Sequence, residues 1–91
     1  MYSLDHTTRF RNDLKAAIKR GYDISLLDEV VETLLKGKPL PVHNRDHALT
    51  GNWRKHRECH ITPDWLLIYK VEKSVLVLTL TRTGTHSDLR L

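Results

Sequence analysis

Hydrophobic positions in the first part of the chain recur with the period of an α-helix. Four apolar side chains share one helical face, at positions i, i+4, i+7 and i+8: Phe10, Leu14, Ala17 and Ile18. The hydroxyl of Thr7 or Thr8 can accept a backbone N–H of the first turn, and Gly21 can adopt the left-handed conformation that ends a helix. The pattern therefore predicts a helix from Thr8 to Arg20.

A second amphipathic segment follows closely. It begins near Ser25, where Asp28 three residues later completes a weak capping box, and Gly37 marks its end. Its apolar positions again fall on one side: Leu27, Val30, Val31, Leu34 and Leu35. Because the connection between the two helices is short, we expect them to form an antiparallel hairpin.

Beyond this hairpin the hydrophobic period changes from that of a helix to that of a strand. Two prolines open a loop that we expect to extend from Lys38 to about Thr50. Short turns at residues 62–64 and 72–74 require antiparallel neighbours. Three strands are predicted after the loop, in addition to a short one at Tyr2–Leu4: Trp53–Ile61, Trp65–Val71 and Val75–Arg82.

These elements predict an α+β fold, with the helical hairpin packed on one face of a small, mainly antiparallel β-sheet and the other face free for function. The 91 residues correspond to a single domain, residues 1–91. No apolar run approaches the roughly 20 residues of a membrane span. The N-terminus also lacks the features of a secretory signal, so we expect a cytoplasmic protein.

Composition restricts the partners without identifying them. The net charge of +4 favours an anionic partner, which could be a nucleic acid or an acidic protein. The single cysteine, Cys59, excludes an internal disulfide, and we expect it to be a small buried residue rather than a nucleophile.

The C-terminal segment places a cation and an imidazole close together. Arg82 could hold a phosphate oxygen through charge-assisted hydrogen bonds, and His86 belongs to the residue type whose ordinary pKa of about 6.5 permits proton transfer near neutrality. The pair suits chemistry on a phosphate. A solvated turn after an edge strand is the alternative.

Other histidines offer no recognisable metal motif. On a strand, alternation places His56, Glu58 and His60 on one face. If the segment were helical, His56 and His60 would resemble half of a zinc site, but the remaining ligands of such a motif are missing. We therefore predict no metal site. Trp53 and Trp65 could be either core residues or base-stacking platforms.

Several short motifs occur in a fixed order along the second half of the chain. They are Asp46-His47-x-Leu49, Gly51-x-Trp53, Arg57-Glu58-x-His60, Asp64-Trp65 and Arg82-Thr83-Gly84-Thr85-His86. Together with the helical hairpin, this pattern resembles the YafQ branch of the RelE superfamily, the toxins of type II toxin–antitoxin pairs. The resemblance covers nearly the whole chain.

The resemblance implies a RelE-like fold and a ribosome-dependent endoribonuclease that cleaves mRNA during translation, without a metal or other cofactor. It implies a cognate antitoxin as partner, with the ribosomal A site and mRNA as targets and operator DNA bound only through the antitoxin. A non-catalytic toxin similar to ParE, or a nucleic-acid-binding module, is the alternative. Such relatives do not need a set of histidines.

Carried over to this chain, the resemblance implies a catalytic set and three substrate contacts. We expect His86 to be the general acid, and Asp64, with His47 or His60, to serve as or orient the base. Arg82 would contact the phosphate, and Trp65 would support the site or a base. The family usually has Phe where this chain has Arg90; an arginine there could stack on a base, contact rRNA phosphate or belong to a frayed terminus.

Overall fold

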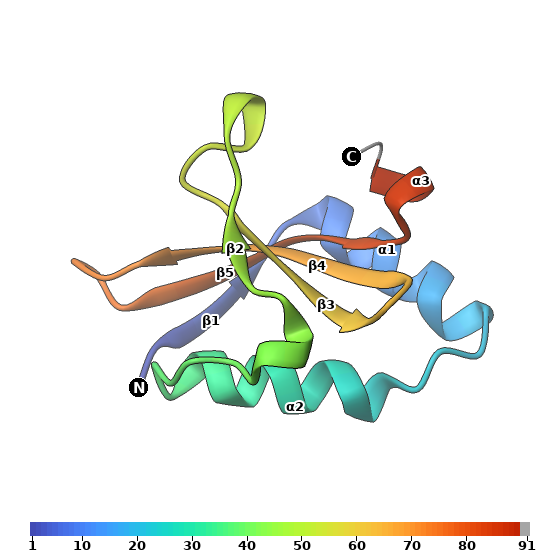
Figure 1. Ribbon diagram of the computed structural model, residues 1–91, viewed down its shortest axis with the longest axis horizontal. Helices are drawn as coiled ribbons and strands as arrows, with labels where there is room; N and C mark the ends of the chain where they lie inside the picture. Colours follow the sequence, from blue (N-terminus) through green and yellow to red (C-terminus); the bar gives the residue numbers. More distant parts are fainter. Residues whose placement is uncertain (90–91) are drawn as a thin grey trace.

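The five-stranded sheet has the order β1-β5-β4-β3-β2 (Figure 1). The computed structural model describes residues 1–89. The strands are β1 (Ser3–His6), β2 (His47–Ala48), β3 (Arg57–Thr62), β4 (Trp65–Glu72) and β5 (Val77–Gly84). The helices are α1 (Thr8–Lys19), α2 (Ile24–Leu35) and the short α3 (His86–Leu89), with 3₁₀ turns at Val42–Asn44 and Gly51–Trp53.

Local capping fixes where the two long helices begin. The hydroxyl of Thr7 accepts the backbone N–H of Phe10 at 2.9 Å, and the carboxylate of Asp23 accepts that of Ser25 at 3.1 Å. Both helices end in a residue with right-handed conformation, followed in each case by a glycine at positive φ. The predicted helices are therefore confirmed to within one residue at each start.

Both long helices cover the same face of the sheet. Apolar residues of α1 and α2 form the main core with alternate residues of the strands, including Cys59, Trp65, Leu67, Tyr69 and Leu78. The helix α1 packs mainly against β5, and α2 packs against β3. The predicted α+β architecture is confirmed. No helix among residues 1–89 is long and apolar enough to cross a membrane.

The sheet is antiparallel except at one edge. Strand β1 pairs with β5 in parallel, from Ser3 opposite Val77 to His6 opposite Leu80. The remaining neighbours, β5-β4-β3-β2, are all antiparallel. The parallel pair joins the two ends of the described chain, which no short turn could connect.

The segment around residues 47–57 differs from the prediction. Residues 51–53 form a 3₁₀ turn, and Gly51 and Lys55 have positive φ values of 63° and 69°, so an extended strand begins only at Arg57. The two-residue strand β2, inside the predicted loop, pairs with Glu58 and Arg57 of β3. So short a strand carries no period of its own and exists because its partner is present.

The sequence predicted that the second face of the sheet is free, but part of this face is covered. Leu66 and Ile68 of β4 are fully buried there beneath Leu89 of α3, with Leu49 and Trp53 packed alongside. In Figure 1, α2 runs below the sheet and α3 lies above it. Trp53 is therefore packed against a small second core, and the open part of this face is confined to one end.

Candidate active site

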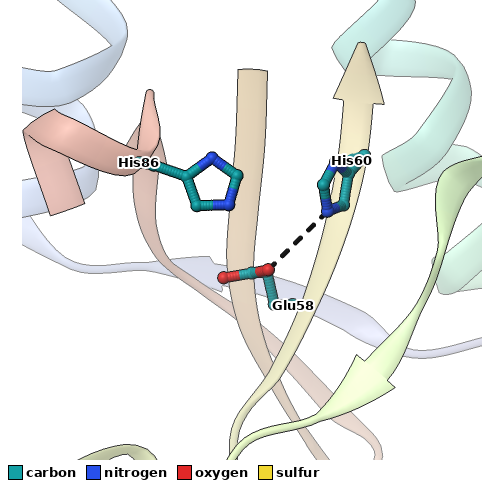
Figure 2. Close-up of side chains that lie close together, drawn as sticks. All are labelled: Glu58, His60 and His86. Carbon is teal, nitrogen blue, oxygen red and sulfur yellow. Dashed lines mark ion pairs between the residues drawn. The ribbon is translucent and has the colours of Figure 1, made fainter. Parts of the chain in front are cut away.

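Three histidines and one glutamate gather on the face of the sheet opposite the long helices. Glu58 and His60 are alternate residues of β3, so both point away from the core that holds Cys59. His47 lies directly across from Glu58 in the β2–β3 pairing. His86 begins α3. Figure 2 shows Glu58, His60 and His86 pointing toward one another.

Glu58 is at the centre of this cluster and is almost entirely buried, with 4 % of its surface exposed. Its Oε1 atom lies 3.5 Å from Nε2 of His47 and 3.8 Å from Nε2 of His60. A buried carboxylate flanked by imidazoles stabilises a positive charge that forms on either ring. Glu58 can therefore hold and orient both histidines during proton transfer.

The hydrogen bond of His47 decides which of its ring nitrogens carries a proton. Nδ1 lies 2.7 Å from the carbonyl oxygen of Arg45, and a carbonyl can only accept a hydrogen bond. Nδ1 is therefore protonated, and in the neutral ring the lone pair is on Nε2, the atom that faces Glu58. This tautomer equips His47 to act as a base.

A network on the core side of the sheet holds the strand that carries His47. The carboxylate of Asp46 accepts hydrogen bonds from Arg57 Nη2 at 3.2 Å and from the hydroxyl of Tyr69. Burial, followed by the hydrogen bond to Asp46, raises the pKa of Tyr69 far above its usual value, so the hydroxyl stays protonated as a donor. Because neighbouring residues alternate in direction, anchoring Asp46 on one side directs His47 to the other.

His86 is positioned by a compact capping arrangement. The hydroxyl of Thr85 accepts the backbone N–H of Asp88 at 3.1 Å, and the Asp88 carboxylate accepts the backbone N–H of Thr85 at 3.0 Å. Asp88 also pairs with Arg20 at the end of α1, at 2.6 Å. These contacts lower the pKa of Asp88 well below its usual range, the hydrogen bond from Arg20 being the largest cause.

Glycine is required immediately before this cap. Gly84 has a φ of +154°, and a Cβ added there would lie 2.9 Å from the side chain of Asp88. The ring centroid of His86, thus placed, is 5.8 Å from that of His60, and the two rings are tilted by 62°. The Gly-Thr-His segment therefore brings the C-terminal histidine against β3.

The cluster opens onto a cavity of about 500 Å³. A volume of this order can hold a small ligand such as a nucleotide. Its lining combines the two histidines with a basic loop and the β3–β4 turn: His43, Arg45, His60, Ile61, Thr62, Pro63 and His86.

Asp64, a predicted catalytic residue, is not part of the cluster. It is exposed in the turn between β3 and β4 and lines a neighbouring cavity of about 290 Å³ with Tyr22 and Asp23. Glu58 occupies the position beside the histidines that the sequence had assigned to a carboxylate. The sequence carries a signal for Glu58, because a residue two positions before His60 on a strand lies on the same face as His60.

Two of the residues that the sequence predicted to contact the substrate are engaged in contacts within the fold. Trp65 is only 3 % exposed and belongs to the main core, where its Nε1 donates to the hydroxyl of Thr83 at 2.8 Å, so it is a core residue rather than a base-stacking platform. Arg82 pairs with Asp13 of α1, its Nε donating at 2.7 Å, and only 12 % of its side chain is exposed. Arg90, the third predicted contact, lies outside the described residues.

Cys59 is buried as expected. It is fully enclosed in the main core, and burial raises the pKa of its thiol to about 12. The thiolate is therefore not formed near neutral pH, and Cys59 takes no part in nucleophilic chemistry.

The cluster also has the composition of a metal site, which the sequence did not predict. Glu58, His60 and His86 each offer one ligand atom, and these atoms lie within 4.8 Å of one another. Imidazole nitrogen and carboxylate oxygen suit Zn²⁺ and Cu²⁺. His56, which the sequence pairs with His60, is not part of this set. The third ligand is His86 of α3, which lies far from β3 in the sequence.

The five-stranded sheet with both long helices on one face is a RelE-like fold, which solved YafQ toxin structures share. Residues 2–91 match the family described as the bacterial toxin of type II toxin–antitoxin systems, YafQ, and the chain belongs to this family.

Known relatives cover almost the whole chain. A protein of Escherichia coli K12 named mRNA interferase toxin YafQ is 37% identical over 87 residues, 94% of this chain and 92% of that protein. The toxin in the crystal structure of the Escherichia coli DinJ–YafQ complex has a TM-score of 0.90 and 36% identity, covering 98% of each chain. A copper-bound mutant toxin from Helicobacter pylori has a TM-score of 0.92 and 43% identity, covering 98% of this chain and 99% of that one.

Proposed function

We propose that this protein is an endoribonuclease that cleaves mRNA on the translating ribosome, in the cytoplasm. The observation that carries the proposal is the cluster of His47, Glu58, His60 and His86, of which His60 and His86 line a nucleotide-sized cavity. The name of the Escherichia coli relative, mRNA interferase, supports the choice of substrate.

The proposed reaction uses the ribose 2′-hydroxyl of the RNA as nucleophile. A base removes the 2′-hydroxyl proton while the oxygen attacks the adjacent phosphorus, and an acid protonates the departing 5′-oxygen. The bond from phosphorus to the 5′-oxygen breaks as the bond to the 2′-oxygen forms. The products are a 2′,3′-cyclic phosphate, which water can open to a 3′-phosphate, and a 5′-hydroxyl end.

The geometry favours a particular division of labour. His47 is the base because its protonated Nδ1 leaves Nε2 as the acceptor. His86 is the acid, since it lines the cavity beside His60. Glu58 holds His47 and His60 and stabilises the imidazolium that proton abstraction creates. Asp64, which the sequence assigned to the base, has no part in this scheme, because it is exposed in the turn between β3 and β4 and lies outside the cluster.

Ribosome-dependent cleavage by His86→Ala tests this assignment. Loss of a general acid lowers the cleavage rate on the order of 10²- to 10⁴-fold. His56→Ala is the matched control, because His56 lies outside the cluster and the cavity lining. Unchanged cleavage by His86→Ala, or equal loss in both variants, would contradict the assignment.

The charge and the relatives together support an antitoxin partner. We infer that an antitoxin with an acidic segment binds this protein, because the chain carries a net charge of +4 and the Escherichia coli relative crystallised as a complex with DinJ. Operator DNA would be bound through the antitoxin. The ParE-like alternative predicts growth arrest that persists when His47, His60 and His86 are replaced together, whereas the nuclease predicts that growth resumes.

We further propose that a transition-metal ion inhibits the enzyme by binding to Glu58, His60 and His86. The copper-bound relative from Helicobacter pylori supports this proposal, as does the ligand geometry. A bound ion occupies the nitrogen lone pairs needed for proton transfer. Calorimetric titration with Zn²⁺ should show binding that His86→Ala weakens, while cleavage persists in a chelator that removes transition metals and leaves the Mg²⁺ of the ribosome in place. Loss of cleavage in the chelator would overturn the metal-independent mechanism.

A further inference from the structure

The proposed reaction needs a permanent positive charge that the histidine cluster does not supply. Negative charge develops on the non-bridging phosphate oxygens in the transition state, and an arginine is the usual group that stabilises it. Arg82, the residue predicted for this role, is engaged by Asp13 and held against α1. A different cation must therefore face the phosphate.

Within residues 1–89, Arg45 is the one guanidinium in the lining of the cavity shared by His60 and His86. Its side chain is exposed, and within residues 1–89 no carboxylate lies within 4.0 Å of it. Three other arginines of the described chain do have a carboxylate partner, in the ion pairs Arg20–Asp88, Arg57–Asp46 and Arg82–Asp13. Arg45 therefore presents an uncompensated positive charge to the cavity.

The backbone around Arg45 is fixed to both sides of the cluster. Its carbonyl accepts the Nδ1–H of His47 at 2.7 Å, and its own N–H donates to Val42 at 3.0 Å. The preceding residue, the buried Asn44, donates to the carbonyl of His60 at 2.8 Å. Arg45 itself has a φ of 48°, a left-handed conformation that turns the chain at this point. The position of its Cα relative to the two histidines is therefore fixed.

We propose that Arg45 binds the phosphate at which the RNA is cleaved and stabilises the charge on its oxygens. This proposal rests on the proposed nuclease function and assigns to Arg45 the role that the sequence assigned to Arg82. A guanidinium can form two charge-assisted hydrogen bonds to a phosphate, so the affinity of this site for phosphate should depend on the side chain at position 45.

An NMR titration with a nucleoside 3′-monophosphate tests the proposal. This probe resembles one product of the proposed reaction. Arg45→Gly removes the charge and suits the left-handed conformation, so the loop and the bond to His47 are kept. We expect its dissociation constant to rise on the order of 10- to 100-fold, since a charge-assisted hydrogen bond is lost. Arg45→Lys should retain most of the affinity.

Arg54→Gly is the matched control. Like Arg45, Arg54 is exposed and directly follows a 3₁₀ turn. Its carbonyl oxygen also lies near the Nδ1 atom of the histidine two residues later, 3.3 Å from Nδ1 of His56. Arg54 is not part of the cavity lining. Its variant should bind the probe as the wild type does.

Unchanged binding by Arg45→Gly, or equal weakening by Arg54→Gly, overturns the proposal. The chemical shifts of the His47 ring show whether its hydrogen bond is intact, which separates loss of charge from loss of structure. Cleavage of ribosome-bound mRNA is measured in parallel. If the wild type binds the probe through Arg45 and does not cleave, the proposed nuclease function fails while the phosphate site stands.

Discussion

Glu58 shows how much one residue's burial changes the chemistry around it. The carboxylate has little exposed surface and lies within 4 Å of two imidazole nitrogens. In so enclosed a position, the electrostatic effect of the carboxylate on a nearby imidazolium is greater than it would be in water. The role of the residue therefore comes from its surroundings as much as from its type.

Replacing Glu58 by Gln should lower cleavage on the order of 10- to 100-fold, because the shape is kept and the charge that supports the imidazolium is lost. Glu58→Asp should restore part of the rate. Cleavage of ribosome-bound mRNA measures the effect, and thermal unfolding shows whether the fold is intact. Glu72→Gln, at the exposed end of β4, is the control. A Gln variant as active as the wild type would remove Glu58 from the site.

At the scale of elements, two ion pairs connect α1 to the end of the sheet that carries His86. Arg82 on β5 pairs with Asp13, and Asp88 on α3 pairs with Arg20. The Asp13 carboxylate also accepts the backbone N–H of Thr83 at 3.1 Å. The short α3 has too few residues to be stable alone, so His86 depends on these contacts for its position.

The Arg82–Asp13 pair should show a large coupling energy in a double-mutant cycle. The two side chains are 12% and 16% exposed, and removing one partner of a buried pair costs about 3–5 kcal/mol because it leaves the other charge uncompensated. Asp13→Ala and Arg82→Ala should each lower the free energy of unfolding, and the double variant should lose less than their sum. Additive losses, measured by urea denaturation, would contradict this.

The Asp88 contacts should weaken in acid. The folded pKa of Asp88 lies below its ordinary value of 3.8, so the stabilisation is present above about pH 4 and is lost as the pH falls toward the folded pKa. In the wild type, the NMR signals of α3 should therefore be unchanged between pH 5 and pH 4 and should shift only well below pH 4, as the folded carboxylate becomes protonated. Asp88→Asn should already show the altered signals at pH 5. Identical spectra of the two proteins at pH 5 would contradict the role of the carboxylate.

At the scale of the whole molecule, the main core lies between the sheet and the long helices. The second core beneath α3 is much smaller. Leu67 is fully buried in the main core, whereas Val75, in the β4–β5 turn, is 62% exposed. Global stability therefore depends on the helix-covered face, and the open face is available for the site.

Leu67→Ala should cost about 2–5 kcal/mol of the free energy of unfolding, since it leaves a cavity in the main core. Because the total free energy of unfolding of a small domain is about 5–15 kcal/mol, this loss should strongly lower the urea concentration at the midpoint of unfolding. Val75→Ala should change stability by less than about 0.5 kcal/mol. Similar midpoints for the two variants would contradict the division of the molecule into a covered and an open face.

Local patterns in the sequence determined most of the architecture. Thr7, the glycines that follow the helices and the two apolar periods define both helices and the three longer strands, because capping and amphipathicity act between residues close in the chain. The histidines of the cluster were also visible in the sequence, through the family pattern.

Tertiary contacts decided the rest. Arg82 is bound by a partner 69 residues away, and Trp65 lies in the core because residues of α1 and α2 cover that face of the sheet. The strand β2 exists only as a partner of β3, and it brings His47 to Glu58. A local pattern gives residue types and faces, whereas the partner of each charged group, and so its chemistry, depends on which distant segments fold against it.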